Sequence, residues 1–168
     1  LQVLCAVDGA ARGLVVAPGF IDVHSHADRA FEVPEAASIE GFLRQGVTTS
    51  VIGVDGDMDV DTLDRYVGLA DAGQIGINFM SYIGHNSVRK AVLGSARRVP
   101  SESELAAMQA LVREGMDRGA IGLSSGLMYL PGNYAAADEL VSLAGVTAPY
   151  GGRYDSHDRN PVNDLLPS

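Results

Sequence analysis

His24 and His26 are the residues of this chain whose type and spacing point most directly to chemistry. They stand two positions apart at the end of the run GFIDVHSH, in a sequence that contains four histidines. Alternate side chains of a strand share a face, so both imidazoles and Asp22 can point the same way. Neutral imidazole binds zinc and similar metals, but a stable site needs one or two further donors. The pair therefore predicts part of a metal site.

Further donors follow two other strand-like runs. Asp55 comes after VTTSVIGV, and His157 ends RYDSH. Ligands on parallel α/β folds gather at the carboxyl ends of the strands, so we expect a metal centre made by His24, His26, Asp55 and His157. Two structural alternatives stay open. A buried histidine often only bonds a carbonyl, and the Asp-Gly sequence at position 55 is typical of a turn.

Polar residues near other strand ends are candidates for substrate binding. His85 and Arg89 lie in GHNSVR, Ser125 and Tyr129 lie in SSGLMY, and Arg159 directly follows the last strand-like run. The arginine could hold a substrate carboxylate with two parallel hydrogen bonds. Each residue also has a structural alternative. A histidine can close a turn, small hydroxyl residues can fill an interior, and an arginine can pair with a neighbouring aspartate.

Short apolar runs alternate with helical patterns along the chain. The strands are predicted at Phe20–His24, Val47–Gly53, Ile75–Ile83, Ala120–Ser124 and Arg153–His157, and the helices at Ser38–Gln45, Val60–Ala70, Ser101–Arg118 and Ala136–Val146. The clearest helix has a capping box of Ser101 and Glu104, and Gly119 ends it. This alternation predicts an α/β fold with parallel strands, as in an open doubly wound sheet or a barrel. Five strands would make an incomplete eight-stranded barrel, which takes about 250 residues.

Composition excludes several classes of function. The net charge of −9 leaves no basic stripe for nucleic acid or for an anionic membrane surface. No apolar run reaches the roughly 18 to 20 residues of a membrane-spanning helix. Cys5 is the only cysteine, which excludes an internal disulfide. Because both ends look cut, we expect a fragment, and we predict a cytoplasmic location.

Five blocks resemble, in order, those of the amidohydrolase superfamily, and within it the N-acyl-D-amino-acid deacylase (D-aminoacylase) branch. They are APGFIDVHSH, RQGVTTSVIG, IGHNSVR, GAIGLSSGLMYLPG and GGRYDSHDR. The resemblance implies a (β/α)8 TIM barrel of the metal-dependent hydrolase type, of which residues 17–168 would form about the first five βα units. Residues 1–16 would be the remnant of a β-sandwich segment.

The resemblance also implies ligands and a cofactor. Its metal-binding histidines of strands one and five correspond to His24, His26 and His157. The resemblance also implies that one or two divalent ions are bound, with zinc as the expected metal. The sequence departs from the family at Asp55, where well-known members have a cysteine, and a carboxylate is a harder ligand than sulfur. A further histidine and the catalytic aspartate belong to later strands, so we assign no catalytic residue to this chain.

The expected reaction is hydrolysis of N-acyl-D-amino acids to a D-amino acid and a carboxylate. Two alternatives stay open: another amide or cyclic-amide hydrolase, such as a dihydroorotase, hydantoinase or isoaspartyl dipeptidase relative, or a non-catalytic metal-binding fragment. The expected partners are a small N-acyl amino acid and either the rest of the barrel or a second copy. An open five-stranded piece would expose apolar surface and unpaired edges, which favours such association.

Overall fold

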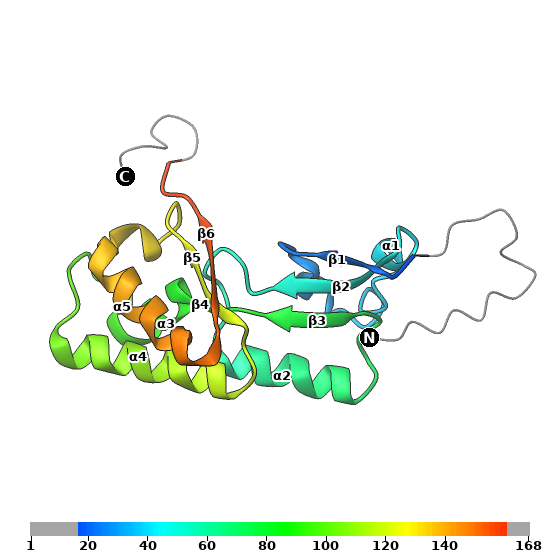
Figure 1. Ribbon diagram of the computed structural model, residues 1–168, viewed down its shortest axis with the longest axis horizontal. Helices are drawn as coiled ribbons and strands as arrows, with labels where there is room; N and C mark the ends of the chain where they lie inside the picture. The colour runs from blue at the N-terminus through cyan, green and yellow to red at the C-terminus, as the bar shows by residue number, and fades with distance from the viewer. Residues whose placement is uncertain (1–16, 161–168) are drawn as a thin grey trace, which may run out of the picture.

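The structure, a computed structural model, describes residues 17–160 (Figure 1). The strands are β1 (Phe20–Asp22), β2 (Val47–Ile52), β3 (Asn78–Ser81), β4 (Ile83–Gly84), β5 (Gly122–Gly126) and β6 (Arg153–His157). The helices are α1 (Glu40–Leu43), α2 (Val60–Asp71), α3 (His85–Leu93), α4 (Glu102–Asp117) and α5 (Ala137–Thr147), with short 3-10 turns at Ala27–Ala30, Gly132–Tyr134 and Ala148–Tyr150. The segment predicted as a β-sandwich remnant, 1–16, lies outside the described residues.

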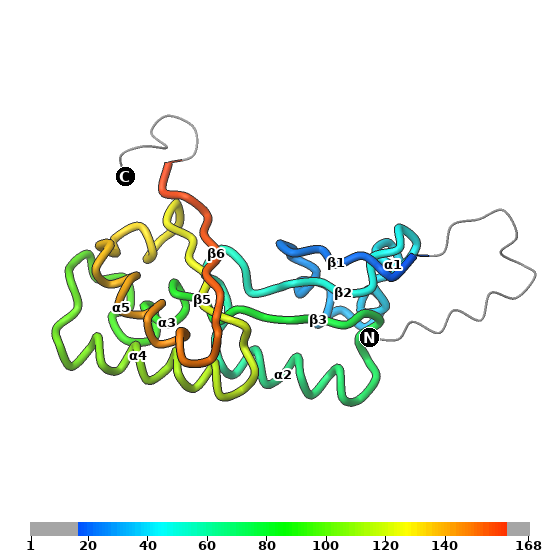
Figure 2. The backbone as a smooth tube through the Cα atoms, in the orientation of Figure 1, coloured from blue at the N-terminus to red at the C-terminus, as the bar shows by residue number. Residues whose placement is uncertain are grey.

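All strand pairs are parallel, as the alternation of strands and helices predicts. The pairing orders are β1-β2-β3 and β4-β5-β6. Two backbone hydrogen bonds join these groups: Tyr82 N donates to Ile52 O at 3.0 Å, and Ile121 N donates to Ser81 O at 2.8 Å. Within the described residues β1 and β6 each pair on one side only, so the sheet is not closed into a barrel (Figure 2).

The third predicted strand, Ile75–Ile83, begins later than expected and is divided in two. Its first part, β3, pairs with β2, and its second part, β4, pairs with β5. The change of partner follows from the path of β2, which turns away at Gly53 in a left-handed conformation with φ 68°. A Cβ at Gly53 would lie 2.6 Å from Tyr82 O, so only glycine fits this turn.

Strands β4 and β5 and the second half of β2 are buried on both faces, which is typical of a parallel sheet. On one face Ile52, Ile83 and Leu123 belong to the main core, and on the other Val51 and Tyr82 form a smaller cluster. Helix α4 contacts α2, α3 and α5, and these helices cover the face of the main core (Figure 1). The main core includes these helical side chains, all buried: Leu63, Tyr66, Val88, Leu93, Met108, Val112, Met116 and Leu143.

Apolar side chains are exposed at the open end of the sheet. Phe20 and Val23 are 62% and 69% exposed, and Ile21 is also exposed. We predict that further strands or a second copy of the chain cover this exposed apolar surface. None of the helices in residues 17–160 is both long and apolar enough to cross a membrane.

Candidate metal centre

The histidine pair lies just beyond strand β1 rather than inside it. The strand ends at Asp22, two residues earlier than predicted, because Asp22 Oδ1 accepts a hydrogen bond from His24 N at 3.3 Å and begins a bend. The chain still follows β2, since Ser25 N donates to Val51 O at 3.0 Å. The rings of His24 and His26 lie 6.1 Å apart between centroids and are perpendicular.

Asp55 lies in the connection from β2 to α2, in the left-handed region with φ 58°. Aspartate tolerates this region better than most residues. Ser124 of β5 holds the turn, because its hydroxyl donates to Gly53 O and accepts from Gly56 N at 3.1 Å. On the other side of the turn, a Cβ at Gly126 would lie 2.1 Å from Asp55 O. The carboxylate is thus presented by a tightly packed turn.

The carboxylate of Asp55 meets both imidazoles. Its Oδ1 lies 3.4 Å from His24 Nε2, and its Oδ2 lies 3.2 Å from His26 Nε2. One donor atom from each residue falls within a set whose members all lie within 4.8 Å of one another. Asp55 Oδ1 is buried and has no hydrogen-bond partner among the described residues. Two nitrogens and a carboxylate with an unused oxygen are a donor set that fits zinc.

A second carboxylate reaches His24 from strand β6. Asp155 Oδ1 and Oδ2 lie 3.4 Å and 3.3 Å from His24 Nδ1. Asp155 was not predicted from the sequence as a residue of the site. Its position two residues before His157, on the same face of one strand, is the signal that could have identified it.

His157 lies outside the group of three donors. Its Nδ1 is 3.2 Å from Asp158 O, and its ring contacts the edge of Tyr129 at 5.0 Å between centroids. The structure therefore brings together three of the four predicted ligands, and ligation by His157 stays a prediction. Asp155 and His157 share a face of β6. Asp155 contacts His24, so His157 lies on the face of β6 that is turned toward the site.

A cleft of about 900 Å³ opens beside the donors. Tyr129, which is exposed, and Lys90 lie on its wall with His26 and Asp55. Further carboxylates surround it, and burial raises the pKa of one of them, Asp28, above its ordinary value. The wall includes these acidic residues: Asp28, Asp55, Asp57, Asp59 and Asp61. Of the four residues predicted to bind substrate, Tyr129 is the one that lines this cleft.

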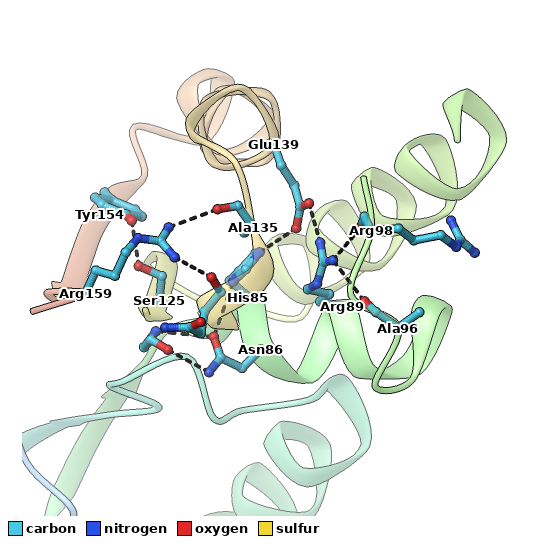
Figure 3. A network of polar contacts seen from close by, with 12 residues as sticks. His85, Asn86, Arg89, Ala96, Arg98, Ser125, Ala135, Glu139, Tyr154 and Arg159 are labelled. Carbon is cyan, nitrogen blue, oxygen red and sulfur yellow. Dashed lines mark hydrogen bonds and ion pairs between the residues drawn. The ribbon is translucent and has the colours of Figure 1, made fainter. Parts of the chain in front are cut away.

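His85 and Arg89 of helix α3 lie in a buried network. His85 Nε2 is 2.8 Å from Glu139 Oε1, and Arg89 Nη1 donates to Glu139 Oε2 (Figure 3). Burial alone would raise the pKa of Glu139, but hydrogen bonds from His85 and Arg89 outweigh it and hold that pKa below its ordinary value. Glu139 was not identified from the sequence, because it stands 54 residues from His85.

The remaining substrate candidates are also engaged with protein groups. Ser125 is fully buried, with its Oγ 2.6 Å from Tyr154 Oη and 3.1 Å from Ser156 Oγ. Arg159 donates to the backbone carbonyl of Ala135 (Figure 3). It also donates to the backbone carbonyl of Asn133. The substrate-binding roles of His85, Ser125 and Arg159 stay predictions.

Comparisons with known proteins find deacylases of D-amino acid derivatives among the relatives. No protein-family model matches the chain. The N-acyl-D-glutamate deacylase of Alcaligenes xylosoxydans xylosoxydans is 33% identical over 172 residues, which are 89% of this chain and 35% of the relative. The D-aminoacylase of the same organism is 34% identical over 176 residues, which are 92% of this chain and 36% of the relative.

A solved structure has the same arrangement of elements. The N-acyl-D-glutamate deacylase of Bordetella bronchiseptica, complexed with zinc and a phosphonate inhibitor, matches with a TM-score of 0.78 and 32% identity. The match covers 88% of this chain and 35% of that one. The chain thus spans about a third of the length of the curated relatives it matches. The chain is homologous to the amino-terminal region of the D-aminoacylases of the amidohydrolase family.

Proposed function

We propose that this chain supplies the first part of the active site of a metal-dependent N-acyl-D-amino acid deacylase. The reaction is hydrolysis of the amide bond, with release of a D-amino acid and a carboxylate. The observation that carries the proposal is the convergence of His24, His26 and Asp55 within 4.8 Å at the ends of β1 and β2. The likeness to deacylases supports the substrate class.

The ion that we propose is zinc. His24 and His26 would hold it through their Nε2 atoms, and Asp55 through its carboxylate. When bound, a divalent ion supplies an activated water nucleophile and polarises the amide carbonyl. Asp55 contributes negative charge from a turn held by Ser124, so its position is set before substrate arrives. We place His157 as a fourth ligand, and the proton-transferring aspartate in a later strand of the complete protein.

The substrate would lie in the cleft beside Asp55, against Tyr129. We also propose His85, Ser125 and Arg159 as substrate-binding residues, as the sequence predicts. We propose that further βα units complete a (β/α)8 barrel by pairing with the free edges of β1 and β6. Those units would also cover the exposed side chains of Phe20 and Val23. The predicted cytoplasmic location stays a prediction.

The complete protein is expected to hydrolyse N-acetyl-D-amino acids and to leave the L-enantiomers intact. A chiral chromatography assay of the released amino acid measures this directly. Dihydroorotate, hydantoin and isoaspartyl dipeptides serve as competing substrates in the same assay. Turnover of one of these without D-specific deacylation would refute the proposed substrate class, and no turnover of any would favour a non-catalytic metal-binding protein.

A further inference from the structure

The ring of His24 lies between two carboxylates. Its Nδ1 is 3.4 Å from Asp155 Oδ1 and 3.3 Å from Asp155 Oδ2, while its Nε2 is 3.4 Å from Asp55 Oδ1. A neutral imidazole carries one proton, so only one nitrogen can donate while the other has a lone pair for a metal. Which nitrogen carries the proton decides whether His24 can bind a metal beside Asp55.

The position of Asp155 suits it to decide which nitrogen of His24 carries the proton. It lies within β6, where it pairs with Ser124 of β5, and its side chain is 23% exposed. His24 by contrast lies in a bend beyond β1, and its side chain is 43% exposed. In the part of the chain that the structure describes, the His24 ring makes its one hydrogen bond to Asp155. The sheet therefore holds Asp155 in place, whereas His24 lies outside a strand.

Asp155 is not itself placed as a ligand. The group of donor atoms within 4.8 Å of one another contains His24, His26 and Asp55, and Asp155 does not belong to it. It contacts Nδ1, whereas Asp55 contacts Nε2, the other nitrogen of the ring. Histidines that bind metals usually donate their second N–H to such a carboxylate, which fixes the tautomer and raises the basicity of the ligand.

We infer that Asp155 is a positioning residue for His24: it accepts the Nδ1 proton and thereby directs the Nε2 lone pair toward the metal. This inference rests on the metal site of the proposed function. Outer partners of this kind contribute roughly 10- to 100-fold in metal affinity. Asp155 would therefore matter for metal binding without touching the metal.

The experiment measures zinc affinity by chelator competition for the full chain and for its Asp155→Ala, Asp155→Asn, Asp158→Asn and His24→Ala variants. Nitrogen NMR of the metal-free chain reports the His24 tautomer in parallel. Asp155→Ala is expected to lower zinc affinity about 10- to 100-fold and to reduce the Nδ1–H tautomer. Asp155→Asn keeps an acceptor oxygen and is expected to retain more affinity than Asp155→Ala. Asp158→Asn removes an exposed neighbouring charge and is expected to bind like the parent chain.

Two results would overturn the inference while leaving the metal site intact. One is an unchanged His24 tautomer or an unchanged zinc affinity in Asp155→Ala, with His24→Ala still impaired. The other is an equal loss in Asp155→Asn and Asp155→Ala, because it would show that the acceptor oxygen is not what matters. If His24→Ala itself binds zinc like the parent chain, the metal site of the proposed function is refuted as well.

Discussion

Glu139→Gln is expected to lower the free energy of unfolding by about 3–5 kcal/mol at pH 7, because it leaves the buried Arg89 guanidinium without its counter-charge. Glu139 and Arg89 are 4% and 0% exposed, and both nitrogen donors of the network, His85 and Arg89, point at the one carboxylate. Glutamine keeps the shape but not the charge. Urea unfolding at equilibrium, followed by circular dichroism, measures the change.

Two controls separate the buried charge from general damage. Glu32→Gln breaks an exposed ion pair with Arg65 and is expected to change stability little, since solvent screens such pairs. The double variant Arg89→Met with Glu139→Leu removes both charges and is expected to be more stable than Glu139→Gln. A double variant as unstable as the sum of its two single variants would contradict the account, since it would show no coupling between the charges.

The same network predicts a dependence on pH. The pKa of Glu139 is lowered in the folded state, so its contribution to stability is present above the ordinary value of 4.5 and is lost as the pH falls through the lowered value. The stability difference between the parent chain and Glu139→Gln should therefore shrink as unfolding is measured at successively lower pH below 4.5.

Asp55→Ala, His24→Ala and His26→Ala are each expected to lower zinc affinity by more than the roughly 10- to 100-fold that loss of an outer partner costs, because each removes a donor to the ion itself. The deacylase activity that we propose for the complete protein should fall with the bound metal. Equilibrium dialysis with metal analysis measures the binding.

Asp57→Ala is the matched control for Asp55→Ala. Asp57 lies in the same turn and carries the same charge, but it contacts Ser87 and is not among the converging donors. We expect Asp57→Ala to bind zinc like the parent chain. Equal losses in both variants would show that the acidic turn attracts cations without a defined site.

The sequence was sufficient for the features that local patterns determine. Helix α4 begins after the N-cap Ser101, with both hydrogen bonds of the capping box to Glu104, because that signal lies within four residues. The parallel order followed from the alternation of strands and helices. That order also placed His24, His26 and Asp55 together, since carboxyl ends of neighbouring parallel strands lie at the same edge.

Features that depend on partners far apart in the chain were missed. Helix α3 buries His85 and Arg89 on its inner face, so the sequence of this helix lacks a continuous apolar stripe. The counter-charge for Arg89 comes from Glu139, which is distant in the sequence. Asp155 is 131 residues from His24, and only the pairing of β6 with β5 brings it near. The division of the third strand arises because β2 turns away before β5 takes its place, which no local pattern encodes.

The central claim is that one divalent ion binds where the side chains of His24, His26 and Asp55 converge. The most direct test is a crystal structure of the chain with zinc, with anomalous diffraction recorded at the zinc edge. The account predicts an anomalous peak about 2.0–2.2 Å from the Nε2 atoms of both histidines and from an Asp55 oxygen. Zinc found only elsewhere on the protein, with these three side chains free of it, would contradict the account.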